Sequence, residues 1–324
     1  MAPVVFHLVS LKSVDDKDSF VFALKSLSSA ERPLWAATPN HWISEPQLSA
    51  STLIGSGPQV QAWDYVVVFK SPTREIPELP AALQPLVALR WSITAEVQDE
   101  MIDNLSTRKA AMVAGTPPPL PDGWSAADHS GNDSAKAPTD VKISLKTPSR
   151  AFGSDKSGTG TPMKEVIRDI GVNHPGPVAM LNFLSYLPNQ RPKYLEFMGA
   201  FQVTVGPKYG GQPLLVGLGV SDWSSRAEEE AGGQVGEWED AALLWYPEVW
   251  HFAKMLDDPM YTDLDRRHKT GVVRDNTVLC CTEVNLDLGI RERPPRFSSL
   301  CPHQTKVASG IKPLCGGQSS RDPQ

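Results

Sequence analysis

The chain has 324 residues, which favours roughly two domains at about 100–200 residues each. Hydrophobic residues make up 40% and charged residues 21%, a balance that permits a folded core and argues against disorder throughout. Lys and Arg total 31 against 37 Asp and Glu, giving a formal net charge of −6. This balance argues against a nucleic-acid-binding protein, because such proteins usually carry a basic surface.

The sequence also allows predictions of the protein's cellular location and of metal binding. No apolar run approaches the roughly 18 residues that a membrane-spanning helix needs, and residues 1–7 lack the features of a secretory signal. The four cysteines, Cys280, Cys281, Cys301 and Cys315, form no C-x-x-C pair and no zinc spacing, and they suit a reducing compartment. We expect a cytoplasmic protein with no metal, no membrane partner and no nucleic-acid partner.

The first block, residues 1–112, alternates apolar runs with amphipathic stretches. In chain order the pattern predicts a strand at 4–11, a helix at 15–28, strands at 34–43 and 63–69, a helix at 77–89 and a strand at 90–97.

Residues 113–172 are predicted to be a linker. From Gly115 to Pro162, 30 of the 48 residues are Pro, Gly, Ser, Thr or Asp, so the segment buries too little apolar surface to offset the entropy of ordering it. Residues 153–160 superficially resemble a phosphate-binding loop. They lack the Lys and Ser/Thr that follow the second glycine of that motif, so we reject a phosphate site.

The second block, residues 173–287, precedes a polar tail at 288–324. The pattern predicts a strand at 178–184, a helix at 191–205, strands at 213–220 and 238–246, a helix from Pro247 that continues through 261–268, and a strand at 277–284.

The two blocks share the order β-α-β-β-α-β, and their landmarks match. Trp63 is followed by a proline nine residues later, and so is Trp238. His7 and Asn182 each stand three residues before a serine that ends the first predicted strand. These matches indicate a duplication followed by divergence.

The shared order is that of the ferredoxin-like motif, an antiparallel sheet with both helices on one face. Runs such as 66–69 and 241–244 are apolar on both sides, so the other face of each sheet must also be covered. We predict an α+β protein in which two ferredoxin-like units pack as an intramolecular pseudo-dimeric α+β barrel. Such a chain is expected to be a monomer.

Four motifs in the second block carry a resemblance to a known family. Residues 177–184, 208–211, 238–247 and 255–261 resemble the dimeric α+β barrel superfamily, above all its small stand-alone members of unknown function. Residues 1–100 resemble it by topology, and the two-block layout resembles uncharacterised fungal tandem proteins. The superfamily includes cofactor-free monooxygenases of polyketide-like aromatics, haem-dependent enzymes, decarboxylases and cyclases, so the resemblance does not fix one activity.

Polar residues on otherwise apolar strands are the first candidates for a site. His7, Asn182 and Asp240 each stand in a predicted strand. A buried polar side chain needs partners, so each is either satisfied structurally or lines a pocket. Asp240 could equally pair with an arginine or face solvent.

A second candidate is the cluster of Trp245, Tyr246, Trp250 and His251, with His268 further along. Aromatic rings with imidazoles are suited to a flat ligand, and histidine is suited to proton transfer near neutral pH. The alternative is that Trp245 and Trp250 belong to the core and that His251 faces solvent.

We assign no site to two further features, the lone histidines and a basic run. Haem-dependent members of the superfamily use a lone histidine as axial ligand, but nothing singles out His251 or His268, and we expect no cofactor. The basic run 266–269 is interpreted as the solvated end of a helix.

The sequence therefore supports two hypotheses. The first is binding or cofactor-independent conversion of a hydrophobic, polyketide-like small molecule by proton transfer, cyclisation or oxygenation, with His7 or His251 as base and Asn182 orienting the substrate. The expected substrate contacts are Trp238, Asp240, Trp245, Tyr246, Tyr209 and His268. The alternative is a non-catalytic structural or interaction protein that retains the scaffold.

Overall fold

The structure is a computed structural model that describes residues 1–48, 53, 63–74, 76–121, 124, 163–222 and 238–286. Most of the predicted linker and the tail with Cys301 and Cys315 lie outside the described residues. The strands are β1 (Ala2–Leu11), β2 (Trp35–Ser44), β3 (Tyr65–Lys70), β4 (Val87–Val97), β5 (Val178–Tyr186), β6 (Gln212–Asp222), β7 (Asp240–Tyr246) and β8 (Val273–Glu283).

Helices connect and cover these strands. They are α1 (Lys17–Ser26), α3 (Asp99–Asp103), α4 (Leu105–Ala114), α5 (Met163–Asn173), α6 (Arg191–Val203), α7 (Val205–Lys208), α9 (Val249–Leu256) and α10 (Pro259–His268), with the 3-10 turns η1 (Val14–Asp16) and η2 (Gln84–Leu86). In the described part of the chain, no helix has the length and apolar character that crossing a bilayer requires.

The eight strands of the described residues form one closed antiparallel barrel in the order β1-β3-β2-β8-β5-β7-β6-β4. The first four strands lie in the order β4-β1-β3-β2, and the last four repeat it as β8-β5-β7-β6. Two seams join the halves: β2 pairs with β8, and β4 pairs with β6. The prediction of an α+β barrel is confirmed at this level, and both blocks contribute to one sheet.

The strands are apolar on both faces because each face meets other apolar side chains. On β5, Ala179, Leu181 and Phe183 belong to the barrel interior, whereas Val178 and Met180 belong to the outer core beneath the helices. Successive side chains of a strand point to opposite faces, so a near-continuous apolar run satisfies both cores.

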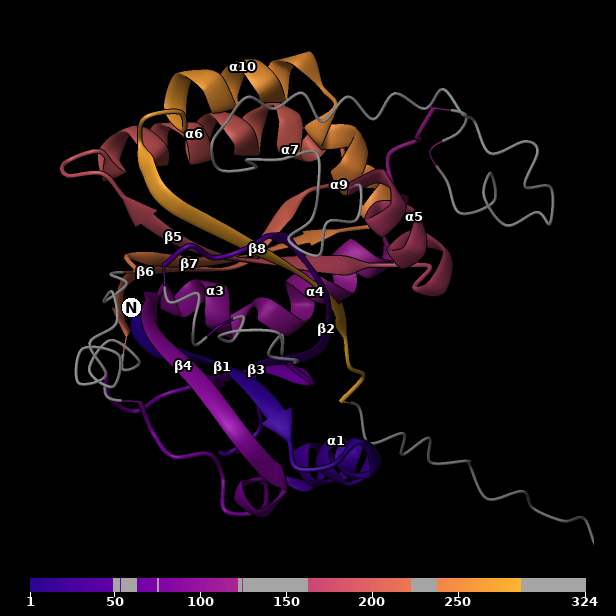
Figure 1. Cartoon of the computed structure of the whole chain (residues 1–324), viewed down its shortest axis with the longest axis vertical. Helices are drawn as coiled ribbons and strands as arrows, with labels where there is room; N and C mark the ends of the chain where they lie inside the picture. Colours follow the sequence, from indigo (N-terminus) through magenta and orange to yellow (C-terminus); the bar gives the residue numbers. More distant parts are fainter. Residues whose placement is uncertain are drawn as a thin grey trace, which may run out of the picture. The chain divides into compact units, whose positions relative to one another are not determined.

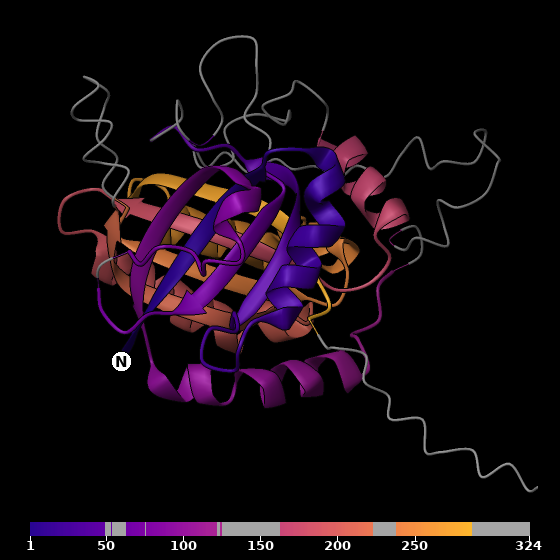
Figure 2. The same ribbon diagram turned by 90° about the horizontal axis from the view of Figure 1, so that it is seen from below.

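The two halves are covered differently on the outside. Helices α5, α6, α9 and α10 pack on the outer face of β5, β7 and β8, with α6 and α10 side by side (Figure 1). On the first half, α1 packs on the sheet together with the irregular segment that contains Leu79 and Leu83 (Figure 2). The outer core is therefore thicker over the second half.

The predicted helix at 77–89 is wrong. The segment forms only the turn η2, and β4 already begins at Val87. Pro77, Pro80 and Pro85 account for the difference, because proline lacks the N–H that a helix interior needs and clashes with the preceding turn.

Three helices were not predicted. Helices α3 and α4 contribute Ile102, Leu105 and Met112 to the barrel interior. Helix α5 includes the last ten residues of the segment predicted as linker, and it buries Met163, Val166, Ile167 and Ile170 against the outer core. The spacing of those four residues is that of an amphipathic helix, so the signal was present but was hidden by the polar segment before it.

The seam between β4 and β6 offers a test of closure. A Cβ added at Gly217 would lie 2.5 Å from the Cβ of Ala95 across the seam. Gly217→Ala should therefore lower the free energy of unfolding by about 1–3 kcal/mol through overpacking. Gly199→Ala is the control, because a Cβ there meets nothing within 4 Å in α6, and it should stabilise by about 0.5–1 kcal/mol. Urea unfolding measures both, and equal midpoints for Gly217→Ala and wild type would contradict the tight seam.

Candidate functional site

A cavity lies between the outer face of the second half's sheet and the helices above it. Its volume is about 40 Å³, enough for roughly three water molecules. The lining residues are Met180, Asn182, Tyr194, Phe197, Met198, Phe201, Leu244, Tyr246, Phe252, Met255, Tyr261, Lys269 and Val278.

Asn182 brings a polar group to the sheet side of the cavity. It lies on β5 opposite Ala242 of β7 and Val278 of β8. Its Nδ2 donates to the carbonyl of Met180 at 2.9 Å, and its Oδ1 is 3.5 Å from Nδ2 of Asn276. These contacts hold the amide in place on the strand.

Aromatic residues form the helix side. Tyr194, Phe197 and Phe201 lie three and four residues apart on α6, so they share the face that packs towards the sheet. The ring centroids of Tyr194 and Phe197 are 5.5 Å apart, and Tyr261 of α10 meets Phe197 edge-on at 6.2 Å. The helix side of the cavity is therefore a wall of mutually packed aromatic rings.

Three tyrosines of the lining keep their protons. Burial raises the pKa of Tyr194, Tyr246 and Tyr261, and the nearby carboxylate of Asp265 raises it further for Tyr194 and Tyr261. Their hydroxyls are neutral O–H groups near neutral pH, able to donate a hydrogen bond to an oxygen.

Lys269 is the charged residue that the lining contains. Its ammonium lies 3.4 Å from Oδ1 of Asp265, one helical turn earlier, and 5.2 Å from the ring centroid of Phe197. The interpretation of run 266–269 as solvated is wrong for Lys269, whose side chain is 4% exposed. It holds for Arg266 and Arg267, which are exposed and pair with Asp263.

Of the predicted site residues, Asn182 and Tyr246 line the cavity. Trp238 and Trp245 instead belong to the barrel interior, on the other side of the sheet. Their indole N–H groups have no hydrogen-bond partner among the described residues. Trp250 is buried in the outer core, as the alternative interpretation expected.

Asp240 and Tyr209 are held in polar contacts away from the lining. Asp240 accepts from Tyr186 at 2.9 Å and from two nitrogens of Arg191 at 2.9 and 2.8 Å, so it pairs with an arginine, one of the two possibilities left open. Tyr209 donates to Asp258 at 2.7 Å.

The three histidines lie apart from one another and outside the cavity lining. His7 is on the outer face of the first half, with Nδ1 2.7 Å from Oγ of Ser92. His251 is buried, not solvent-facing, and its Nε2 lies 2.9 Å from the carbonyl of Pro118. His268 lies 3.6 Å from Glu196 between α10 and α6. Their catalytic or binding roles remain predictions.

The residues that sequence reasoning missed are Tyr194, Tyr261 and Lys269. Tyr194 lies in the helix predicted at 191–205, and its spacing with Phe197 and Phe201 marks the face of that helix that packs on the core. Tyr261, Asp265 and Lys269 follow one another at four-residue intervals, which places them on one helix face, and that spacing was the available signal. Across the described ranges, no group of three His, Cys, Asp or Glu side chains is arranged to hold a metal ion.

No family model and no curated protein matches the chain. Among solved structures, a protein of unknown function from Rhodopseudomonas palustris is 23% identical over 38% of this chain and 95% of its own, with a TM-score of 0.31. Two proteins, each named "putative monooxygenase", also match. The one from Lactobacillus acidophilus is 9% identical over 87% of this chain and 94% of its own, with a TM-score of 0.40. The one from Fusobacterium nucleatum is 10% identical over 88% and 93%, with a TM-score of 0.39.

The buried His7 predicts a pH dependence of stability. Burial, with a smaller contribution from Arg90, lowers the pKa of His7 from 6.5 to about 3. Between these values the unfolded chain binds a proton that the folded chain does not, so the free energy of unfolding falls as pH falls, by up to about 1.4 kcal/mol per pH unit.

His7→Gln removes that proton, so its stability should fall less than that of the wild type between pH 6.5 and 4.5. Urea unfolding across this range measures the difference. His174→Gln, which changes an exposed histidine, is the control and should follow the wild type. Parallel curves for His7→Gln and wild type would contradict the burial argument.

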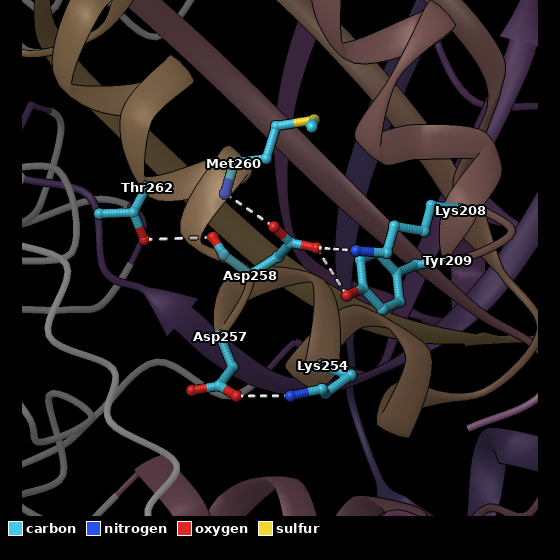
Figure 3. Close-up of polar contacts among 7 residues, drawn as sticks. All are labelled: Lys208, Tyr209, Lys254, Asp257, Asp258, Met260 and Thr262. Atoms are coloured by element: carbon cyan, nitrogen blue, oxygen red, sulfur yellow. Dashed lines mark hydrogen bonds and ion pairs between the residues drawn. The ribbon is translucent and has the colours of Figure 1, made fainter. Parts of the chain in front are cut away.

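Asp258 fixes the start of α10, which carries Tyr261 (Figure 3). Its carboxylate accepts from Lys208 at 2.6 Å, Tyr209 at 2.7 Å and the backbone N–H of Met260 at 2.7 Å. Burial alone would raise the pKa of Asp258, but these hydrogen bonds outweigh it and leave the pKa below its usual value. The stabilisation is therefore complete above about pH 4 and is lost as pH falls below that value.

Asp258→Ala should lower the free energy of unfolding by about 2–3 kcal/mol at pH 7, because a helix cap and a buried hydrogen bond are lost together. Asp257→Ala is the matched control, since the neighbouring carboxylate pairs only with Lys254 among the described residues and should cost less than about 1 kcal/mol (Figure 3). Thermal or urea unfolding measures both. Equal losses in the two variants would refute the role of Asp258.

Proposed function

We propose that the cavity binds a small hydrophobic, aromatic molecule. The observation that carries this proposal is the composition of the lining: aromatic and aliphatic side chains surround a few fixed polar groups. Ligand sites in proteins have this character, with apolar walls for affinity and sparse polar groups for orientation. The anchored amide of Asn182 is the orienting group on the sheet side.

The finer proposal is that the bound molecule is converted there without a cofactor, by proton transfer, cyclisation or oxygenation. The neutral hydroxyls of Tyr194, Tyr246 and Tyr261 support it, because they can stabilise negative charge that develops on a substrate oxygen. A polyketide-like aromatic is the kind of substrate that suits such a wall.

The volume sets a condition on binding. Sites for drug-sized ligands measure about 300–1,000 Å³, far more than the 40 Å³ here. Three methionines, Met180, Met198 and Met255, line the cavity. Methionine is unbranched and changes rotamer easily, so the cavity can widen around a ligand at little cost.

We also propose that the halves are two ferredoxin-like units forming a pseudo-dimer within one chain. The repeated strand order supports this, as do the two seams that pair an edge of one half with an edge of the other. A chain closed in this way has no sheet edge left to pair with a second copy, which supports a monomer.

The small volume favours one alternative, a structural or interaction protein in which the cavity holds only water. The same experiment decides between the two. Methionine methyl groups labelled with ¹³C report the cavity directly by NMR, because Met180, Met198 and Met255 line it and Met112 and Met163 do not.

Titration with toluene, indole or acetophenone should shift the methyl signals of the three cavity methionines and leave those of Met112 and Met163 unchanged. Leu244 of β7 lines the cavity and is half-buried. Leu244→Trp should fill the cavity and abolish the shifts, while the circular dichroism spectrum stays that of the wild type. Absence of any shift in the wild type would refute the binding function and favour the structural alternative. Where the shifts are seen, native mass spectrometry of the purified protein identifies any ligand that is retained.

A further inference from the structure

We propose that the side chain of Met198 on α6 controls access to the cavity: it has to turn aside before a ligand enters or leaves, and it therefore sets the rates of binding and release. The inference rests on the proposed binding function and adds a residue that governs entry. The entrance, as named here, lies between Met198 on the helix side and Leu244 of β7 on the sheet side.

Burial shows where the cavity lining reaches the surface. Every residue of the lining is buried except Met198 and Leu244, which are half-buried. Both of these side chains also pack against the outer core. Each of the two residues therefore belongs to the lining, contacts the core and reaches solvent, so the route from solvent to the cavity that crosses the least protein runs between α6 and β7.

Aromatic contacts close two other borders of the cavity. Tyr261 of α10 meets Phe197 of α6 edge-on, with ring centroids 6.2 Å apart. Tyr246 of β7 meets Phe252 of α9 in the same way at 5.3 Å. All four residues are buried, so an opening between α6 and α10, or between β7 and α9, would separate packed rings. Opening at Met198 displaces one half-buried side chain instead.

Helix α6 is held at both ends, which restricts how the entrance can open. At its start, Arg191 donates to the two carboxylate oxygens of Asp240 at 2.9 and 2.8 Å. Beyond its end, Lys208 of α7 donates to Asp258 at 2.6 Å (Figure 3). Met198 lies near the middle of the helix, between these two anchors. Rotation of its side chain is therefore an easier motion than displacement of the helix.

The two residues of the entrance differ in how easily they move. Methionine is unbranched and changes rotamer at little cost. Leu244 lies on a strand that is paired on both sides, opposite Met180 of β5 and Pro213 of β6. The sheet side of the entrance is therefore fixed, and the helix side carries the side chain that moves.

Met198→Ile tests the proposal, because isoleucine is also apolar and similar in size but keeps essentially one χ1 rotamer in a helix. Entry and release of acetophenone should both slow by about fivefold or more, while their ratio, the dissociation constant, changes by less than about threefold. NMR line shapes of the ¹³C-labelled methyls of Met180 and Met255, recorded during the titration, measure both rates.

Met198→Ala shortens the side chain at the entrance and should raise both rates above those of the wild type. An entry rate that Met198→Ile leaves at the wild-type value, or that Met198→Ala does not raise, overturns the inference and leaves the binding function standing. Methyl signals that no probe shifts in the wild type overturn both.

Two control variants place the same branched residue elsewhere. Leu195→Ile changes an exposed residue of α6 that is not part of the lining, so both rates should stay at the wild-type values. Met255→Ile changes a buried residue of the lining, so it should alter release through affinity and leave the entry rate unchanged, with Met180 as the reporter. Entry that slows as much in Met255→Ile as in Met198→Ile overturns the role of Met198.

Discussion

Backbone pairing of β2 with β8 and of β4 with β6 is the constraint on which the rest of the molecule depends. A four-stranded sheet has two edges whose N–H and C=O groups need partners, and each half of the chain supplies the partner for the other. Once the sheet is closed, its inner face becomes one interior that both halves must fill, and its outer face needs helices. Both requirements follow from closure, which explains why strands such as β5 are apolar on both sides.

The site owes its place to an asymmetry between the halves. Over the second half, complete helices stand above the sheet, and large side chains on both layers leave a cavity between them. Over the first half, prolines prevent the corresponding helix, and Leu79 and Leu83 pack directly on the strands. His7, at the position that matches Asn182, meets Ser92 and the ring of Phe69 there. The repeated strand order thus places two polar groups in similar settings, but the helices differ.

Strand positions could be predicted because apolar runs bounded by loops are strong signals. Asn182 and Tyr246, which line the cavity, could be named as candidates because their strands were predicted. Which face a residue occupies was harder to predict. Trp245 and Tyr246 are neighbours in one strand, yet they point into different cores, since a shift of one residue reverses every side chain. Lys269 was missed because a basic run at a helix end usually faces solvent, and only the packing of α10 on α6 turns one of its four members inward.

Two buried carboxylates of this region differ in how far their hydrogen bonds offset the cost of burial. Asp258 accepts hydrogen bonds from a hydroxyl, an ammonium and a backbone N–H, so the cost of burying it is offset and it ties α10 to the end of α7. Oδ1 of Asp265 has no hydrogen-bond partner among the described residues and only the ammonium of Lys269 at 3.4 Å. Buried ion pairs often contribute no more to stability than apolar residues of the same size. The polar contacts of Asp258, rather than this pair, therefore fix the start of α10 against the end of α7.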